Sequence, residues 1–135
     1  MKFSERIQRI QPSMTLAVDA KAKELRANGE DIISFGAGEP DFETPEKIKQ
    51  AGITAIETNI THYTPVGGID ALKQAIVNKF QRDNNLSYNK NQILVSCGAK
   101  HSLFNLAQVL WEEGDEIIVP APYWVSYPDI VLLAG

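Results

Sequence analysis

The sequence predicts an α/β protein with parallel strands. Two continuous apolar runs, residues 93–97 and 117–120, are typical of strands buried on both faces of a sheet. A helical stripe of apolar residues lies between them, and the order strand, helix, strand is that of a parallel βαβ unit. Because parallel sheets usually have more than two members, we expect the sheet to be incomplete within this chain, which would then be a piece of a larger or partner-dependent protein.

The N-terminal part is predicted to contain one helix, over residues 15–28. Its apolar positions lie near one face, and Gly29 follows as a helix stop. Residues 32–35, "IISF", form a short apolar run typical of a strand or an extended segment. Residues 36–45, "GAGEPDFETP", are too rich in glycine and proline for regular structure.

Two further helices are predicted in the middle of the chain. Thr44 is expected to cap the first, with Pro45 at its first helical position. The predicted buried face of this helix consists of Ile48, Ala51, Gly52, Ala55 and Ile56. The loop "YTPVGG", residues 63–68, precedes a second predicted helix. Its apolar residues at helical spacing are Ile69, Leu72, Ile76 and Phe80, and the pattern ends at residues 84–85.

The C-terminal part contains the βαβ unit. The helix between the two strands has an apolar stripe of Leu103, Leu106, Ala107, Leu110 and Trp111. "EEGDE" turns the chain into the second strand, and the aromatic loop "PAPYWVSYP" follows that strand. The run "DIVLLAG" predicts the end of another helix, with Gly135 just past it.

Composition excludes several classes of protein. The net charge of −4 and the scattered basic residues leave no electrostatic footprint for nucleic acid. No apolar stretch reaches the ~18 residues of a membrane span, and the charged N-terminus has no apolar signal core. The single cysteine, Cys97, excludes an internal disulfide and fits a reducing compartment. These features predict a cytoplasmic protein without a membrane or nucleic-acid partner.

The segment "SCGAKHSLF" contains the first candidate site. A strand, a glycine turn at Gly98 and a helix start form an anion site, because backbone N–H groups and the helix dipole favour negative charge there. Lys100 on the first turn would add a positive charge. The alternative is a tight turn beside a solvated lysine, and the segment matches neither nucleotide-binding fingerprint.

Three loops could contribute to the same site. Trp124 follows a strand and could stack on a flat heteroaromatic ring, or pack in a core or interface. Gly36 and Gly38 would let a ligand approach the backbone, and Tyr63 offers a phenol. These loops could equally be simple turns.

No metal site is predicted from the histidines or the cysteine. His62 and His101 have no carboxylate or cysteine partners at ligand-like spacing. For Cys97 a buried, inert thiol is favoured over a nucleophile.

Taken in order, four segments resemble the class I aminotransferases of pyridoxal-phosphate fold type I. They are "GAGEPDFETP", "HYTPVGGIDALKQAI", "SCGAKHSLFNL" and "EGDEIIVPAPYWVSYP", and the bacterial aspartate aminotransferase branch is the most similar. The resemblance runs through essentially the whole chain. It implies an α/β fold in which residues 1–42 form an N-terminal arm and small-domain segment, and residues 43–135 form the first part of the cofactor-binding large domain.

The resemblance also implies roles for individual residues. Gly98, Ala99 and Lys100 match the turn that holds the phosphate of pyridoxal 5'-phosphate, and Trp124 matches the aromatic that stacks on its ring. Tyr63 matches a tyrosine that reaches the phosphate of the neighbouring subunit, which implies a homodimer. Gly38 matches the glycine whose N–H meets the substrate carboxylate. The implied substrates are an amino acid, with aspartate favoured, and a 2-oxo acid.

The family's catalytic residues have no counterpart in this sequence. The lysine that forms a Schiff base with the cofactor lies in a later segment of the family, as do the acid that pairs with the pyridine nitrogen and the arginine that binds the substrate carboxylate. We therefore expect no catalytic residue in this chain, and no transaminase activity from it alone.

Three other functions share the resemblance. A C–S lyase or a cyclopropane-carboxylate synthase would keep the same cofactor residues, and only later substrate residues would separate them. The third possibility is the aminotransferase-like effector domain of a transcription regulator. That protein would need a DNA-binding helix-turn-helix before it, whereas this chain starts at Met1 with the enzyme-like segment.

Overall fold

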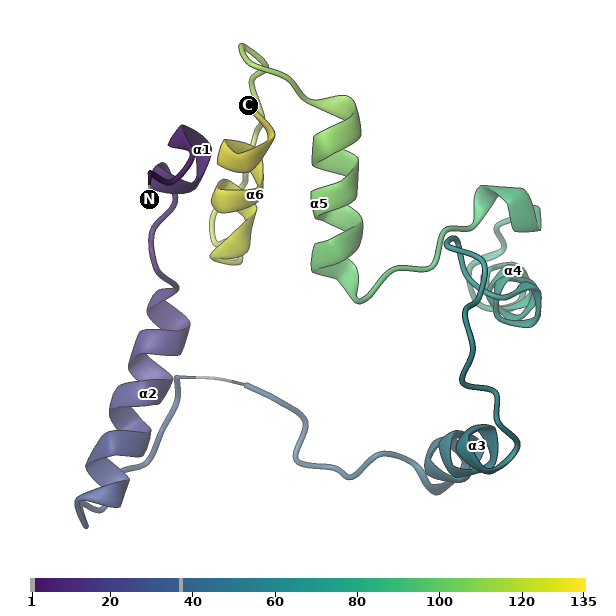
Figure 1. Ribbon diagram of the computed structural model, residues 1–135, viewed down its shortest axis with the longest axis horizontal. Helices are drawn as coiled ribbons and strands as arrows, with labels where there is room; N and C mark the ends of the chain where they lie inside the picture. Colours follow the sequence, from purple (N-terminus) through teal and green to yellow (C-terminus); the bar gives the residue numbers. More distant parts are fainter. Residues whose placement is uncertain (1, 37) are drawn as a thin grey trace. The chain divides into compact units, whose positions relative to one another are not determined.

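The computed structural model describes residues 2–36 and 38–135, and the described residues are helical or without regular structure (Figure 1). The helices are α1 (Glu5–Gln8), α2 (Met14–Ala27), α3 (Glu46–Glu57), α4 (Asp70–Asn84), the 3-10 helix η1 (Lys90–Gln92), α5 (Ala99–Leu110) and α6 (Ser126–Ala134). The sequence patterns predicted α2, α3, α4, α5 and the end of α6, whereas the short helices α1 and η1 were not predicted.

The chain divides into two compact units. The terminal unit combines Met1–Glu43 with Leu103–Gly135, and the middle unit is Thr44–Ser102. Helix α5 begins in the middle unit and continues into the terminal unit.

The predicted strands are not formed in the described part of the chain. Residues 32–35, 93–97 and 117–120 have no strand assignment, although the backbone at Ile93 is extended, with φ −108° and ψ 125°. A strand requires backbone hydrogen bonds to a neighbouring strand. The two predicted parallel strands belong to different units, residues 93–97 to the middle unit and 117–120 to the terminal unit. The described residues therefore do not show the expected incomplete sheet.

In the middle unit, the segment after α4 folds back onto that helix. The Nζ of Lys90 in η1 lies 2.6 Å from the Oδ2 of Asp70 at the start of α4. The rings of Phe80 and Tyr88 meet edge to face, with centroids 5.5 Å apart. The hydrogen bond from Lys90 holds the pKa of Asp70 below its ordinary value, and the positive charge of Lys90 adds to this effect.

In the described part of the terminal unit, one residue is buried on each of α2, α5 and α6. These residues are Ala22, Ala107 and Ile130. The Nε2 of Gln108 on α5 donates to the carbonyl of Leu133 on α6 over 3.2 Å, and α1 contacts α6. These contacts place the short helix α1, which the sequence pattern did not reveal, against the C-terminal helix.

The start of α3 differs by one residue from the expectation. Pro45, and not Thr44, is the N-cap, because its ψ of 138° is not helical. The Pro45 carbonyl accepts the N–H groups of Ile48 at 2.8 Å and Lys49 at 3.1 Å. The bulk of the helix is as predicted, and ends of helices are where sequence patterns are least informative.

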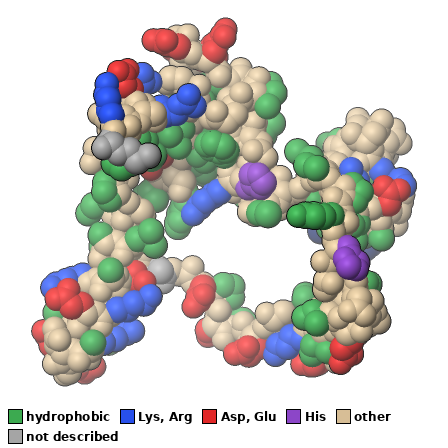
Figure 2. Space-filling view, viewed as in Figure 1, with side chains coloured by type: hydrophobic (Ala, Val, Ile, Leu, Met, Phe, Trp, Pro, Cys, Tyr) green, Lys and Arg blue, Asp and Glu red, His purple; other side chains and the backbone are tan. Residues whose placement is uncertain are grey.

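Most of the predicted buried face of α3 is exposed, and only Ala55 on it is half-buried. Ile48 is 61% exposed and Ile56 69% exposed, and no atom lies within 4 Å of the position that a Cβ would take at Gly52. Apolar side chains also lie at the surface elsewhere in the chain (Figure 2). The prediction of an amphipathic helix was correct, but the described part of the middle unit leaves its apolar face largely uncovered.

Candidate functional site

The turn that precedes α5 is built around Gly98. Its φ of +83° lies in the left-handed region, where glycine is favoured, and no atom lies within 4 Å of where a Cβ would be. The Gly98 N–H donates to the Ser96 carbonyl over 2.9 Å, and the Gly98 carbonyl accepts the Ser102 N–H at 3.3 Å. Helix α5 then begins at Ala99, so that the turn opens directly onto a helix N-terminus.

The electrostatics of this helix start favour an anion. The first N–H groups of an α-helix have no acceptor within the helix, and the dipole places partial positive charge there. The first turn of α5 carries Lys100 and no acidic residue, and Lys100 is exposed. Gly98, Ala99 and Lys100 thus form the turn and the start of this helix.

The cysteine before the turn is exposed, which overturns the expectation of a buried thiol. Its backbone N–H donates to the Nδ1 of His101 over 3.0 Å. The sequence reasoning missed this contact, although the spacing of four residues across a helix start could have indicated it. His101, in the first turn of α5, is thus hydrogen-bonded to the backbone just before Gly98.

Tyr63 lies in the same unit as this turn and is fully exposed. Its loop closes through a hydrogen bond from the Gly68 N–H to the Pro65 carbonyl at 2.9 Å. The Val95 N–H, three residues before Gly98, donates to the Gly67 carbonyl over 3.0 Å. The loop after Tyr63 is therefore attached to the segment that leads into the Gly98 turn.

Gly38 and Trp124 belong to the terminal unit. Gly38 is exposed, with nothing within 4 Å of a Cβ position, while its neighbour Ala37 lies outside the described residues. Gly36 serves packing in this structure, because a Cβ there would lie 2.9 Å from the Val18 Cγ1 of α2.

The aromatic loop runs into α6. Trp124 is 48% exposed and Tyr123 is 50% exposed, and the Trp124 carbonyl accepts the Tyr127 N–H at 3.0 Å. The peptide bond between Ala121 and Pro122 is cis. The indole of Trp124 is thus half-exposed at the surface of its unit.

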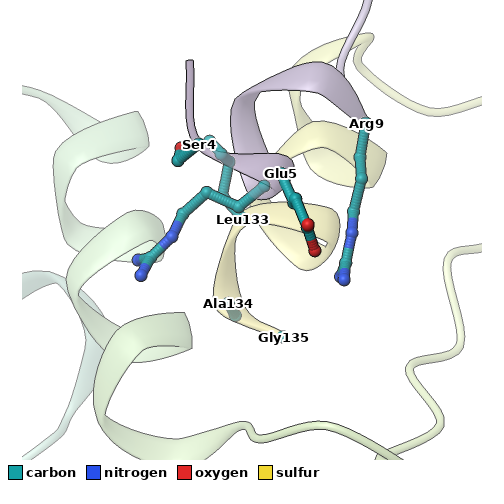
Figure 3. Close-up of a pocket in the computed structure, with 7 residues that line it drawn as sticks. Ser4, Glu5, Arg9, Leu133, Ala134 and Gly135 are labelled. Carbon is teal, nitrogen blue, oxygen red and sulfur yellow. The ribbon is translucent and has the colours of Figure 1, made fainter. Parts of the chain in front are cut away.

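Two cavities of the terminal unit are not lined by Gly38 or Trp124. One, of about 410 Å³, lies between α1 and the end of α6, and its lining includes Glu5, Arg9, Leu133 and Gly135 (Figure 3). The other, of about 310 Å³, is mainly apolar, and its lining includes Leu103, Trp111 and Ile130. None of the site residues predicted from the sequence lines either cavity.

The described residues provide neither a metal site nor a membrane span. No group of three or more histidine, cysteine or acidic side chains among them could hold a metal ion. No helix in that part of the chain is both long and apolar enough to cross a membrane.

The comparisons with known sequences agree with one another. The family described as aminotransferase class I and II matches residues 30–135. The chain is 60% identical over 134 residues to an aspartate/prephenate aminotransferase of Nitrosomonas europaea, covering 99% of this chain and 34% of the relative. It is 54% identical over 135 residues to an aspartate aminotransferase of Geobacillus stearothermophilus, covering 100% of this chain and 34% of the relative. The chain thus spans about a third of the length of the curated relatives it matches.

Solved structures show the same similarity in three dimensions. An aspartate aminotransferase from Thermus thermophilus with maleate superposes with a TM-score of 0.95 at 47% identity, over 100% of this chain and 35% of that one. An alanine aminotransferase from Pyrococcus furiosus superposes with a TM-score of 0.91 at 28% identity, over 99% of this chain and 35% of that one. The backbone path described above is therefore shared with these enzymes.

Proposed function

Because the chain belongs to the class I and II aminotransferase family, we propose that its protein transfers an amino group between an amino acid and a 2-oxo acid with pyridoxal 5'-phosphate. Aspartate is the proposed amino donor, since the quoted bacterial relatives carry that name and the Thermus structure contains maleate, a four-carbon dicarboxylate like aspartate. The family match over residues 30–135 is the observation that carries this proposal.

The residues of the α5 turn fit the phosphate of this cofactor. A phosphate carries negative charge and accepts hydrogen bonds, and the start of α5 offers N–H groups, a positive dipole end and the exposed Lys100. At Gly98 the space that a Cβ would fill is open, so a ligand can approach the backbone. We assign Gly98, Ala99 and Lys100 to phosphate binding.

The remaining residues would hold the ring, the substrate and the neighbouring phosphate. Trp124, half-exposed on its loop, would stack on the pyridine ring, and the Gly38 N–H would bind the substrate carboxylate. Tyr63 would donate its phenol hydrogen to the phosphate of a neighbouring subunit in a homodimer, a role that its full exposure permits. When bound, pyridoxal phosphate supplies the electron sink for the amino-acid carbanion.

The domain organisation and the sheet are part of the same proposal. Residues 1–42 would form the arm and small-domain segment, and residues 43–135 the first part of the large domain, in which residues 93–97 and 117–120 would pair with further strands. This is supported by the high structural similarity to complete aminotransferases. A cytoplasmic location is also proposed, and the single, exposed Cys97 is compatible with a reducing compartment.

An assay of the protein as its gene encodes it tests the function. With pyridoxal phosphate, aspartate and 2-oxoglutarate, we expect oxaloacetate to form, with alanine and prephenate as comparison substrates. The purified 135-residue chain alone should show no turnover, since the family's cofactor lysine has no counterpart in it. Turnover by that chain would contradict this part of the proposal.

The C–S lyase alternative predicts a different product. Cofactor-dependent release of pyruvate from a cysteine conjugate, without amino transfer to any 2-oxo acid, would replace the aminotransferase assignment. A regulator would bind the cofactor without turning over any of these substrates. The names of the quoted relatives, all aminotransferases, favour the first function.

A further inference from the structure

Gly68 is in contact with a residue that leads to the proposed phosphate turn. Its φ is +101°, and a Cβ at this position would lie 2.4 Å from the Cγ2 and 2.8 Å from the Cβ of Val95. Val95 is β-branched and rotates little about its first side-chain bond. A side chain at position 68 could therefore be accommodated only if the backbone moved.

Backbone hydrogen bonds make this contact a fixed junction. The Val95 N–H donates to Gly67, the residue before Gly68, over 3.0 Å, and the Gly68 N–H closes the turn onto Pro65 at 2.9 Å. Tyr63 lies two residues before Pro65, and Gly98 lies three residues after Val95. The junction thus joins the Tyr63 loop to the α5 turn within one unit.

We propose that Gly68 is a positioning residue, which sets the Tyr63 loop relative to the Gly98–Lys100 turn by letting the backbone of residues 67–68 lie directly against Val95. This inference rests on the proposed function, in which both elements bind cofactor phosphate. To reach an ordinary contact of 3.4 Å, a Cβ at position 68 and Val95 must separate by about 1 Å. In a catalytic site, a displacement of that size can cost up to about 100-fold in rate.

In the proposed homodimer this junction has a further role. Tyr63 would serve the phosphate of the neighbouring subunit, whereas the α5 turn would serve the phosphate of its own subunit. Because Gly68 joins the two, it would fix the geometry of both cofactor sites relative to each other.

The chain offers a matched control for the backbone strain. Gly114 has the same φ of +101°, but no atom lies within 4 Å of its Cβ position. The substitutions Gly68→Ala and Gly114→Ala therefore impose the same unfavourable backbone conformation, and only the first creates the clash with Val95.

The experiment compares four variants of the protein as its gene encodes it. They are Gly68→Ala, Gly114→Ala, Val95→Ala and the double variant Gly68→Ala/Val95→Ala. For each variant, pyridoxal-phosphate affinity is measured by absorbance titration. Hydrogen exchange of residues 93–97 is measured without cofactor by mass spectrometry.

We expect Gly68→Ala to weaken cofactor affinity about tenfold or more and to speed exchange at the Val95 amide. Gly114→Ala should change neither. The double variant should recover at least part of the affinity, because Val95→Ala removes the atom at 2.4 Å and leaves only the 2.8 Å contact. Where Gly68→Ala gives no folded protein, the double variant takes its place in the comparison with Gly114→Ala.

Three results would overturn the inference: unchanged Val95 exchange in Gly68→Ala, an affinity equal to that of Gly114→Ala, or no recovery in the double variant. Failure of the proposed function looks different, because the unmodified protein would then bind no pyridoxal phosphate. In that case the exchange at Val95 alone decides whether Gly68 positions the Tyr63 loop.

Discussion

At the scale of single residues, Gly98 shows how a local sequence signal can be read correctly. A glycine between an apolar run and a helical pattern predicted a turn that opens on a helix start, and the left-handed φ of +83° explains why glycine is used there. The same reasoning failed for Cys97, whose exposure depends on tertiary packing. It also missed the hydrogen bond from the Cys97 backbone N–H to His101.

Replacing Gly98 tests the turn directly. We expect Gly98→Ala to cost about 1–2 kcal/mol of folding stability, because a Cβ disfavours the left-handed conformation, and to weaken cofactor binding by crowding the phosphate turn. Thermal unfolding and absorbance titration measure the two effects. Gly29→Ala is the control, since Gly29 has a φ of +88° and equally open surroundings outside the site. Equal cofactor affinity in both variants would remove Gly98 from the phosphate site.

Trp124 can be tested against its neighbour. Stacking of an aromatic side chain on a flat base is worth about 1–3 kcal/mol by alanine substitution. Trp124→Ala should therefore weaken pyridoxal-phosphate binding about fivefold or more, and Trp124→Phe should weaken it less. Tyr123→Ala, similarly exposed in the same loop, should leave the affinity unchanged. If Tyr123→Ala weakens binding as much as Trp124→Ala, the loop acts through its conformation and not through stacking.

At the scale of elements, the long helices were predictable because their signals are local. The apolar period, the glycine or asparagine at the end and the polar flanks of α2, α3, α4 and α5 all lie within the helix or beside it. Strands 93–97 and 117–120 were not predictable in the same way, because a strand exists only with a partner. The four-residue α1 is too short to show a period.

The end of α3 offers a stability test. Asn59 follows the helix with a φ of +61°, and the Ile60 N–H donates to the Ala55 carbonyl over 2.8 Å, as at a left-handed helix end. Asn59→Gly should stabilise the fold by up to about 1 kcal/mol, because glycine adopts this conformation without a steric cost. Chemical denaturation measures the change. Asn59→Ala should destabilise, and the opposite order would show that the asparagine side chain itself is needed.

The stability that the contact between η1 and α4 contributes should depend on pH. Lys90 lowers the pKa of Asp70, so the pair contributes stability above the ordinary Asp value of 3.8 and loses it as the pH falls through the lowered value. The effect should be small and should weaken with salt, because both side chains are exposed.

A double-mutant cycle isolates this pair from the helix dipole, which also favours Asp70 in the first turn of α4. Thermal unfolding of Asp70→Asn, Lys90→Gln and the double variant is followed from neutral to acidic pH. The coupling between the two residues should be present at neutral pH and absent at strongly acidic pH. A coupling independent of pH would contradict an ionic contact.

At the scale of the whole molecule, each of the two units leaves large apolar side chains exposed. In the middle unit Ile48 and Ile56 of α3 are examples, and in the terminal unit Ile33 and Phe35 are 78% and 94% exposed. Sequence periodicity correctly marked α3 as amphipathic, but it could not show what covers its apolar face, because covering is a property of distant segments.

The isolated 135-residue chain should therefore self-associate. Large exposed apolar patches drive association and bind hydrophobic dyes. Size-exclusion chromatography with light scattering should give masses above 14.9 kDa, and the chain should enhance the fluorescence of such a dye. A sharp monomer peak without dye binding would show that the apolar faces close on one another in solution.

The hydrogen bond from the Cys97 backbone N–H to His101 also determines the tautomer of the neutral imidazole. A ring nitrogen that accepts a hydrogen bond has no proton, so the neutral ring must be the tautomer with its hydrogen on Nε2. The lone pair at Nδ1 is thereby engaged, and an electrophile that attacks this nitrogen must first displace the backbone amide. In nitrogen-15 spectra, His101 would appear as a single tautomer, in contrast to the mixture expected of a freely solvated ring.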